Sequence, residues 1–386
     1  PNFIVSWQCG NKWIETYRSP ELECIVMQNI WMEDDTLFAD IILPANTKFE
    51  TEDIAADFES GQFHTLMLEQ KCIDPIGDTK SDMEGVGEVA KKLGVYDAYM
   101  EGKSIDDRIK GAYETSGCKD LVSWDELSSK GYYVIPVDKN WESDWKTKEG
   151  SGMSKFAEDP KANPLQTPSG LFEFESVGLK ENFPDDRERP PVPHYIPGGP
   201  GWTHDESLHG EKVKKYPLLI ESNHPRWRVH AEHDDIPWLR EIPTCKVKGP
   251  DGYLYEATWL NPKTAAKYGV KSGDIIRIFN ERGAVLGGAY VTERIVAGVV
   301  YQDHGARLDE IITGQLDRGG SNNCISPADT LSQNCTGMAT SGYLVDIEKV
   351  SGAEIDEWRQ KYPDAFARAY DPAYGMLFEG WIAEEA

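Results

Sequence analysis

The chain lacks three features that would have assigned it quickly: paired cysteines, a long apolar run and an excess of positive charge. Its seven cysteines are widely spaced, and none forms a C-x-x-C pair. This excludes the usual zinc-ribbon and iron–sulfur spacings, and a disulfide framework is not expected in a chain of this size. No apolar run approaches the length of a membrane span, and the first residues do not show the basic-plus-apolar pattern of a signal segment. From these absences we expect a soluble, cytoplasmic protein.

The charge balance excludes further classes of partner. The formal net charge is −26, from 40 basic and 66 acidic residues. Nucleic acid and anionic membrane surfaces would be repelled, so an anionic ligand would need a local basic patch. The sequence also contains no G-x-S-x-G elbow, P-loop, H-E-x-x-H or G-x-G-x-x-G motif.

The apolar content is sufficient for more than one domain. Hydrophobic residues make up 39% and aromatic residues 11% of the 386 positions. This length and composition allow two or three domains with real cores. The sequence begins Pro-Asn-Phe without a methionine, near an expected strand, so we expect it to be the carboxyl-terminal portion of a longer polypeptide.

The most regular pattern lies between residues 255 and 307. Asn261-Pro262 opens a short helix, Lys263 to Tyr268, that Gly269 ends in the left-handed conformation. Apolar runs and an N-x-x-G turn then predict a β-hairpin and a further strand. The predicted strands are 275–279, 284–291 and 299–301. Including 216–220 and 342–347, we expect a β-barrel over residues 215–350.

The first 45 residues alternate between strand and helix signals. Strands are predicted at 3–7, 24–27 and 39–45, with a helix start at 20–23. Such alternation predicts a parallel sheet, whose ligands sit beyond the carboxyl ends of its strands. Gln28 and Asn29 lie at one such end. The segment 1–103 is therefore expected to be a partial α/β domain.

Between these regions the signals are local. We expect a surface loop at 50–72 and a helix from Met83 to Leu93, capped by Ser81 or Asp82 and stopped by Gly94. Residues 104–214 are expected to form a return and connector segment, and 351–386 a tail with a helix at 355–362. Within the connector we expect helices at 105–112 and 124–130, a strand at 132–135, a loop at 140–163, a turn and strand at 167–174, and a Pro/Gly-rich stretch at 184–201.

The sequence concentrates potential ligand-binding groups directly after the first barrel strand. Glu221 to His230 reads ESNHPRWRVH, with two arginines and two histidines in ten residues. Forked guanidinium donors, a hydroxyl and backbone amides suit a pyrophosphate at a strand exit. The candidate ligand-binding residues here are Ser222, Asn223, His224, Pro225, Arg226, Arg228 and His230.

Two alternatives for this stretch stay open. Arg226 and Arg228 could instead pair with Asp234 and Asp235 as a surface network. A zinc site from His224, His230 and His233 is conceivable, but a helical i, i+4 spacing and a convincing fourth ligand are missing.

Two later stretches carry weaker signals. Gly319 to Ser326 reads as a turn that presents amides, with Asn323 within it. Asp303 and His304 follow a strand and could face a pocket, although a core or interface role is favoured for both.

Several of these stretches together resemble the dimethyl sulfoxide reductase family of molybdopterin oxidoreductases. The matching elements are the barrel pattern, VMQNIWMEDDTLFADIILPA, the G-x-x-K-x-D before the helix at 83–93, TPSG at 167–170, the loop SNHPRWRVH and GGSNNCIS. The resemblance implies a double-psi β-barrel that binds molybdopterin guanine dinucleotide. It places Asp82 at a guanine edge, the loop Ser222–His230 around the dinucleotide and Asn323 on the cofactor.

The family resemblance also implies a larger assembly. A complete subunit would hold molybdenum with two molybdopterin guanine dinucleotides, and its metal ligand would come from the amino-terminal half. SNHPRWRVH, the acidic MEDDT segment and the Trp-rich tail are most similar to members that transfer a hydroxyl group between polyhydroxybenzenes beside an iron–sulfur subunit. The implied substrate is an aromatic polyol. The alternatives are another oxidoreductase or hydratase of the family, and a non-enzymatic double-psi barrel that binds a partner.

Overall fold

The computed structural model describes most of the chain. The described residues are 2–57, 63–136, 153–186, 190–193, 206–234, 236–328, 330–332, 335–338, 342–367, 370–371 and 376–377. They form two compact units, each considered by itself below. The first unit contains residues 1–25, 32–41 and 194–386, and the second contains 26–31 and 42–193.

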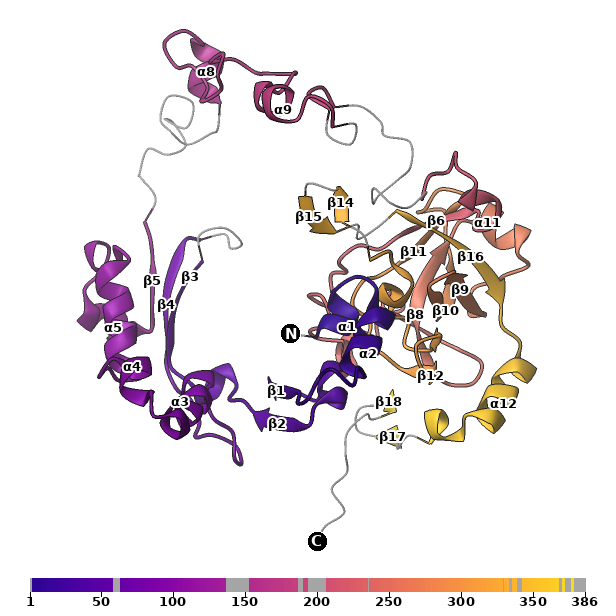
Figure 1. Ribbon diagram of the computed structural model, residues 1–386, viewed down its shortest axis with the longest axis horizontal. Coiled ribbons are helices and arrows are strands. Elements are labelled where there is room, and N and C mark those ends of the chain that lie inside the picture. Colours follow the sequence, from indigo (N-terminus) through magenta and orange to yellow (C-terminus); the bar gives the residue numbers. More distant parts are fainter. Residues whose placement is uncertain are drawn as a thin grey trace. The chain divides into compact units, whose positions relative to one another are not determined.

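A closed barrel forms the centre of the first unit (Figure 1). Six strands pair in a ring, which closes because β10 pairs with both β9 and β8. They are β6 (Leu218–Glu221), β8 (Leu254–Leu260), β9 (Ile275–Asn280), β10 (Gly283–Val291), β11 (Val299–Gln302) and β16 (Tyr343–Lys349). Short strands extend the sheet, namely β7 (Lys246–Lys248), β12 (Glu310–Ile312) and β13 (Leu316–Asp317).

The predicted barrel elements are confirmed. The hairpin β9–β10 turns at Asn280 to Gly283, and the helix α11 (Pro262–Lys267) begins at Asn261, whose side chain accepts a hydrogen bond from Lys263 N. Gly269 has φ +66°, the left-handed conformation expected of it. Alternation along the strands sends Ile220, Leu260 and Ile278 into a fully buried core, which is why the apolar pattern was readable.

The predictions for residues 3–7 and 20–23 are wrong. Residues 3–7 form a helix, α1 (Phe3–Ser6), not a strand, and α2 (Gly10–Tyr17) follows, whereas no helix starts at 20–23. The backbone amides of Phe3 and Ile4 donate to the Asp35 carboxylate at 2.7 and 3.1 Å, a favourable arrangement at the start of a helix. A short apolar run cannot distinguish helix from strand without this partner.

A buried ion pair fixes the amino-terminal segment to the barrel. Asp34 accepts hydrogen bonds from Arg307 Nε at 2.9 Å, Asn2 Nδ2 at 2.6 Å and Leu308 N at 3.1 Å. Asp34 precedes η1 (Asp35–Phe38), a 3-10 helix. Residues far apart in sequence therefore meet around one carboxylate.

The second unit contains a parallel strand pair and a small antiparallel sheet. β1 (Val26–Asn29) and β2 (Ile41–Pro44) run in the same direction, and β3 (Asp53–Asp57), β4 (Thr65–Glu69) and β5 (Tyr132–Val134) pair antiparallel. The predicted loop at 50–72 is wrong, because its apolar residues form β3 and β4 against the helices α5 (Ile105–Thr115) and α6 (Trp124–Lys130). The core of this sheet comprises Leu66, Tyr113, Cys118, Val122 and Leu127.

The strands β1 and β2 occur as predicted but are not buried. Val26 is 52% and Ile42 is 43% exposed, although a parallel sheet covered on both faces was expected. At 167–174 the turn forms, with Gly170 N donating to Thr167 O, but no strand follows it.

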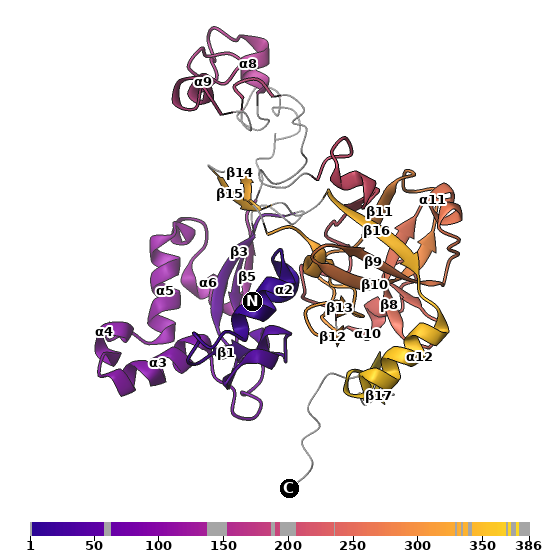
Figure 2. The ribbon, with the colours of Figure 1, turned by 45° about the vertical axis from the view of Figure 1, so that its right-hand side comes forward.

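The remaining elements are short. The helices are α4 (Tyr96–Met100), α8 (Ser154–Glu158), α9 (Val177–Asn182), α10 (Pro237–Arg240) and α12 (Gly352–Lys361); α12 confirms the helix expected in the tail. The strands are β14 (Thr330–Ser332), β15 (Cys335–Met338), β17 (Tyr370–Asp371) and β18 (Met376–Leu377). The 3-10 helices are Lys48–Glu50, Cys118–Asp120, Lys212–Lys214, Asn322–Ile325 (η5) and Pro363–Phe366. Figure 2 shows α12 beside the lower end of the barrel.

Within the described ranges, no helix has the length and apolar character that crossing a membrane requires.

The helix α3 (Asp82–Leu93) confirms the predicted capping, and it gives a simple test of the second unit. Ser81 Oγ accepts from Glu84 N, and Glu84 accepts in return from Ser81 N, forming a capping box. Ser81→Ala should lower the free energy of unfolding by about 1 kcal/mol, measured by urea denaturation. Lys92→Ala, on the same helix, is the control and should change it by under about 0.5 kcal/mol. Equal effects would contradict the capping role.

Candidate functional site

The predicted ligand-binding loop and the turn that holds His304 leave the barrel at the same end. β6 and β11 are parallel neighbours, with Val299 opposite Leu219 and Tyr301 opposite Glu221. Because parallel strands end on the same side, the loop after β6 (Ser222–His230) and the turn after β11 (Asp303–Gly305) meet there. This pairing of non-adjacent strands explains why residues about 80 positions apart in sequence form one site.

Backbone contacts lock this loop and turn together. His304 N donates to Asn223 O at 3.0 Å, and Arg228 Nε donates to His304 O at 2.8 Å. Gly305 has φ +87°, and a Cβ there would lie 1.7 Å from His230 O. Glycine is therefore required at position 305 both by its conformation and by the close passage of the loop. His230 itself has φ +52°, which is uncommon for a residue with a side chain.

Three histidine rings gather at this junction. The ring centroids of His224 and His230 lie 4.5 Å apart, and each lies 5.2 Å from that of His304. Nδ1 of His230 is 3.0 Å from Nε2 of His304. His304 is 7% exposed, whereas His224 and His230 are exposed. Burial, with His230 and His224 beside it, lowers the pKa of His304 to about 4, so this ring is neutral near pH 7.

Asn323 fixes the orientation of His304. Its Nδ2 donates to the carbonyl oxygens of Val5 and Trp7 at 3.0 and 2.7 Å, so its Oδ1 faces Nδ1 of His304 at 3.3 Å. An amide oxygen only accepts, so Nδ1 of His304 carries the proton and Nε2 presents a lone pair. Nδ1 of His230 is then the donor to that lone pair. Asn323 lies in η5 and is buried, so its side chain holds the site from within.

Arg228 lies inside the protein. Its side chain is 0% exposed, and it donates to Glu256 at 2.7 and 3.1 Å and to Asp234 at 2.9 Å. Lys246 Nζ completes the network, 2.6 Å from Glu256 and 3.1 Å from Asp234. Although burial opposes it, Lys246, Arg240 and Arg228 hold the pKa of Asp234 well below its usual range.

The structure therefore gives Arg228 a different position from the one expected of a phosphate ligand. It pairs with Asp234, as the alternative interpretation had it, but in the interior and together with Glu256. Asp235, the other carboxylate of that alternative, lies outside the described residues. We assign a structural role to Arg228, which anchors the loop to the buried acids Asp234 and Glu256.

A further buried acid lies beside this network. Burial, with Glu256 close by, raises the pKa of Asp303 to about 6. Tyr301 donates its hydroxyl to Asp303 Oδ1 at 2.5 Å. Asp303 is 1% exposed, so it belongs to the interior, as the sequence favoured.

The other loop residues lie nearer the surface. Asn223, His224, Arg226 and His230 are exposed, Pro225 is half-buried and Ser222 is buried. Trp227 Nε1 is a buried donor without a hydrogen-bond acceptor within the described part of the chain. An exposed guanidinium, two exposed imidazoles and loop amides form the donor set that a diphosphate needs.

The predicted ligand-binding residues of the second unit lie at the end of β1 and the start of α3. Gln28 Nε2 donates to Asp82 Oδ1 at 2.8 Å, and Asn29 follows at the end of β1. Asp82 is exposed at the first turn of α3, and the capping role belongs to Ser81 instead. Because Asp82 does not cap the helix, its carboxylate has acceptor capacity beyond the Gln28 contact for a ligand that donates hydrogen bonds, as a guanine edge does.

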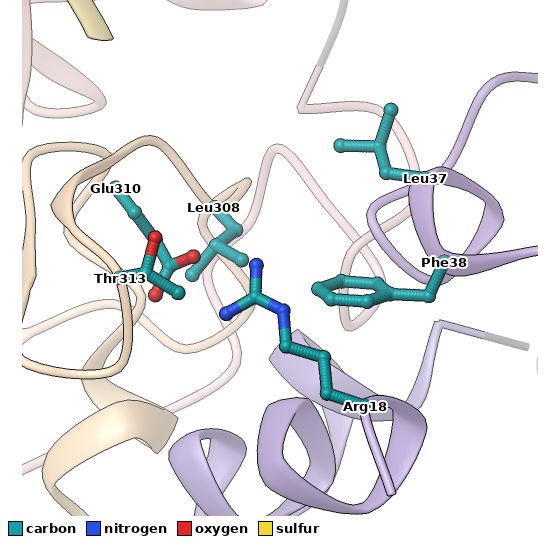
Figure 3. A pocket seen from close by; sticks show the side chains of 6 residues that line it. All are labelled: Arg18, Leu37, Phe38, Leu308, Glu310 and Thr313. Carbon is teal, nitrogen blue, oxygen red and sulfur yellow. The ribbon is translucent and has the colours of Figure 1, made fainter. Parts of the chain in front are cut away.

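A pocket of about 340 Å³ lies elsewhere in the first unit (Figure 3). Arg18 extends across it with its guanidinium carbon 5.3 Å from the centre of the Phe38 ring, and Leu308 and Glu310 face it from the barrel side. Burial raises the pKa of Glu310. None of the predicted ligand-binding residues lines this pocket.

Sequence reasoning underestimated His304 and missed Glu256 altogether. His304 had been noted after a strand, but only the parallel pairing of β6 with β11 places it against the loop. Glu256 carried no signal, because an acid within an apolar strand does not reveal its partners.

The closed six-strand barrel, with the loop Ser222–His230 and the turn Asp303–Gly305 leaving one end, is of the double-psi type. Consistent with this, residues 218–340 match the family described as "Molydopterin dinucleotide binding domain", and residues 2–92 match "Molybdopterin oxidoreductase". The chain belongs to the molybdopterin oxidoreductases of the dimethyl sulfoxide reductase family, and its cofactor is a molybdopterin.

Two enzymes of different kinds are similar to this chain in sequence, and a third shares its fold. The large subunit of pyrogallol hydroxytransferase from Pelobacter acidigallici is 32% identical over 90% of this chain and 42% of its own length. Dimethyl sulfoxide reductase DmsA from Escherichia coli is 31% identical over 85% of this chain and 38% of its own length. The chain thus spans about two fifths of the length of these relatives. Acetylene hydratase from Pelobacter acetylenicus shares the fold, with a TM-score of 0.60 and 18% identity over 91% of this chain and 43% of its own.

Proposed function

We propose that this chain is the carboxyl-terminal part of a molybdenum enzyme that transfers a hydroxyl group between polyhydroxybenzenes, from pyrogallol to phloroglucinol. The observation that carries the proposal is the 32% identity to a pyrogallol hydroxytransferase over 90% of the chain. The junction of the loop Ser222–His230 with His304 and Asn323 supports it, because family motifs distant in sequence meet at one end of the barrel.

The residues present fit the phosphates of a molybdopterin guanine dinucleotide. In a chain of charge −26, Arg226 supplies an exposed guanidinium on the same loop as His224 and His230. We propose that these three side chains and Asn223 bind the diphosphate of one dinucleotide, and that Ser222, Pro225, Arg228 and Asn323 hold the loop in position. Asp82, with Gln28 and Asn29, is proposed to receive a guanine edge.

The division of labour follows from the chemistry. Bound molybdenum supplies the electron transfer, while the protein binds, orients and shields the pterins. We propose two dinucleotides per subunit, a metal ligand from the amino-terminal half of the same subunit, an iron–sulfur small subunit as partner and an aromatic polyol as substrate. We assign no catalytic residue to this chain.

Two alternatives are separated by turnover of the complete subunit with its partner. The proposal requires molybdenum in the enzyme and conversion of pyrogallol in the presence of a tetrahydroxybenzene. Reduction of dimethyl sulfoxide or hydration of an alkyne, without that conversion, would establish another reaction on the same scaffold.

Changing Arg226 tests the ligand-binding loop directly. Arg226→Ala in the complete subunit should reduce bound dinucleotide about tenfold or more, since a charge-assisted hydrogen bond is worth about 1.5–3 kcal/mol. The measurement is guanine nucleotide released by acid, per protein. The matched control is Arg359→Ala, an exposed arginine on α12, which should leave the content unchanged. Full nucleotide content in Arg226→Ala would remove this residue from the site.

A further inference from the structure

The three histidines at the barrel end have the composition of a transition-metal site. One ligand nitrogen from each of His224, His230 and His304 lies within 4.8 Å of the others. The sequence had suggested His233 as the third member, but the structure places His304 there. We propose that these three histidines bind one divalent ion of the zinc class in the chain free of dinucleotide.

The distances are close to those of a tetrahedral centre. Bonds of about 2.0–2.1 Å at tetrahedral angles place two ligand nitrogens about 3.4 Å apart. His230 Nδ1 and His304 Nε2 are 3.0 Å apart, and the whole set spans no more than 4.8 Å. Closing the rings around an ion therefore needs only small ring rotations, which the exposed His224 and His230 can make.

The orientation of the buried ligand is already set. Asn323 accepts the Nδ1 proton of His304, so the Nε2 lone pair points to the centre of the cluster. A hydrogen bond of this kind to the distal nitrogen of a metal-binding histidine fixes its tautomer and ring position. The Asn223 and Arg228 contacts hold the His304 backbone, so the site is built before an ion arrives.

Binding needs one proton rearrangement. In the free chain the Nδ1–H group of His230 donates a hydrogen bond to Nε2 of His304. On binding, that proton moves through solvent to Nε2 of His230, and Nδ1 of His230 coordinates the ion, with no net change in protons or electrons. Imidazole nitrogens favour zinc, nickel, copper and cobalt over magnesium and calcium, which prefer oxygen ligands. Because His224 and His230 are exposed, the fourth position is open to water.

The inference stands apart from the proposed function, because it concerns the chain without dinucleotide. Where His224 and His230 also bind the diphosphate, the ion and the dinucleotide compete for them. Arg226→Ala distinguishes the two proposals: it should lower dinucleotide content and leave zinc binding intact, since Arg226 offers no metal ligand.

The test is equilibrium binding of ZnCl2 and CoCl2 to the chelator-treated chain. We expect one ion per chain, a visible spectrum typical of four-coordinate Co²⁺, and no competition from excess MgCl2. His224→Ala and His304→Ala should each weaken zinc binding at least tenfold, while the control His233→Ala, an exposed histidine of the same segment, should not.

Two outcomes would overturn the proposal: unchanged zinc affinity in His224→Ala, or an equal loss in His233→Ala. If His304→Ala is unstable, the variant His224→Ala, at an exposed residue, provides the test. Circular dichroism of each variant shows whether it is folded.

Discussion

Arg228→Ala should lower the free energy of unfolding by about 3–5 kcal/mol, the usual cost of removing one partner from a buried ion pair. The substitution leaves Glu256 and Asp234, both essentially without solvent contact, to share Lys246 and Arg240. It also removes the donor to His304 O, so the turn after β11 loses an anchor. Urea denaturation followed by tryptophan fluorescence measures the change.

Arg226→Ala is the matched control for this prediction. Arg226 is two residues away on the same loop but exposed, so its loss should change stability by under about 0.5 kcal/mol. Comparing the two variants thus separates the effect of the buried ion pairs of Arg228 on stability from the effect of the exposed Arg226. If both variants unfold at the same urea concentration, the buried network does not stabilise the loop.

A double substitution refines the interpretation. Replacing both Arg228 and Glu256 by leucine removes the unpaired charge that the single change creates. The double variant should therefore be more stable than the sum of its single changes, with a coupling of about 1–3 kcal/mol. Additive effects would mean that the two side chains do not act as a pair.

Gly305→Ala should be the second most damaging change. The new Cβ would lie 1.7 Å from His230 O, at a residue with φ +87°. The left-handed conformation costs about 1–2 kcal/mol, and the overlap adds about 1–3 kcal/mol as the loop shifts. We expect a total of about 2–5 kcal/mol, together with shifted NMR signals of the His230 and His304 rings.

Gly298→Ala provides the comparison. Gly298 has nearly the same backbone conformation, φ +88°, but open space where the Cβ would be. This variant should show the conformational cost of about 1–2 kcal/mol alone, without the shift of the histidine signals. Should the two variants lose equal stability, the loop would have to move away from Gly305 at no cost.

The barrel could be predicted from sequence because its signals are local. The strand alternation, the turn Asn280–Gly283 and the helix ended by Gly269 each depend on neighbouring residues only. The strand predicted at 3–7 failed because its helix depends on Asp35, some thirty residues away. The loop predicted at 50–72 failed because the strand pair β3–β4 is stabilised by α5 and α6, which follow it.

The candidate site was predictable in composition but not in arrangement. The loop Ser222–His230 carried its chemistry in its residue types, and the family resemblance located Asn323. The sequence could not predict which of the two arginines, Arg226 or Arg228, is exposed. The difference depends on the acidic residues that the fold brings close to Arg228. His304 joined the site through strand pairing, a property of topology that no local pattern contains.

Two of the sheets, the barrel and the pair β1–β2, should behave differently in concentrated solution. Ring closure through β10 uses the hydrogen-bonding sides of the barrel strands, and the extensions end in the three-residue strands β7 and β12. The two-stranded pair β1–β2 instead carries exposed Val26 and Ile42, and Lys80 pairs with Pro44 and Ala45 at the end of β2. Because exposed apolar strands can pair with strands of other chains, we expect self-association of the isolated polypeptide to begin at β1–β2.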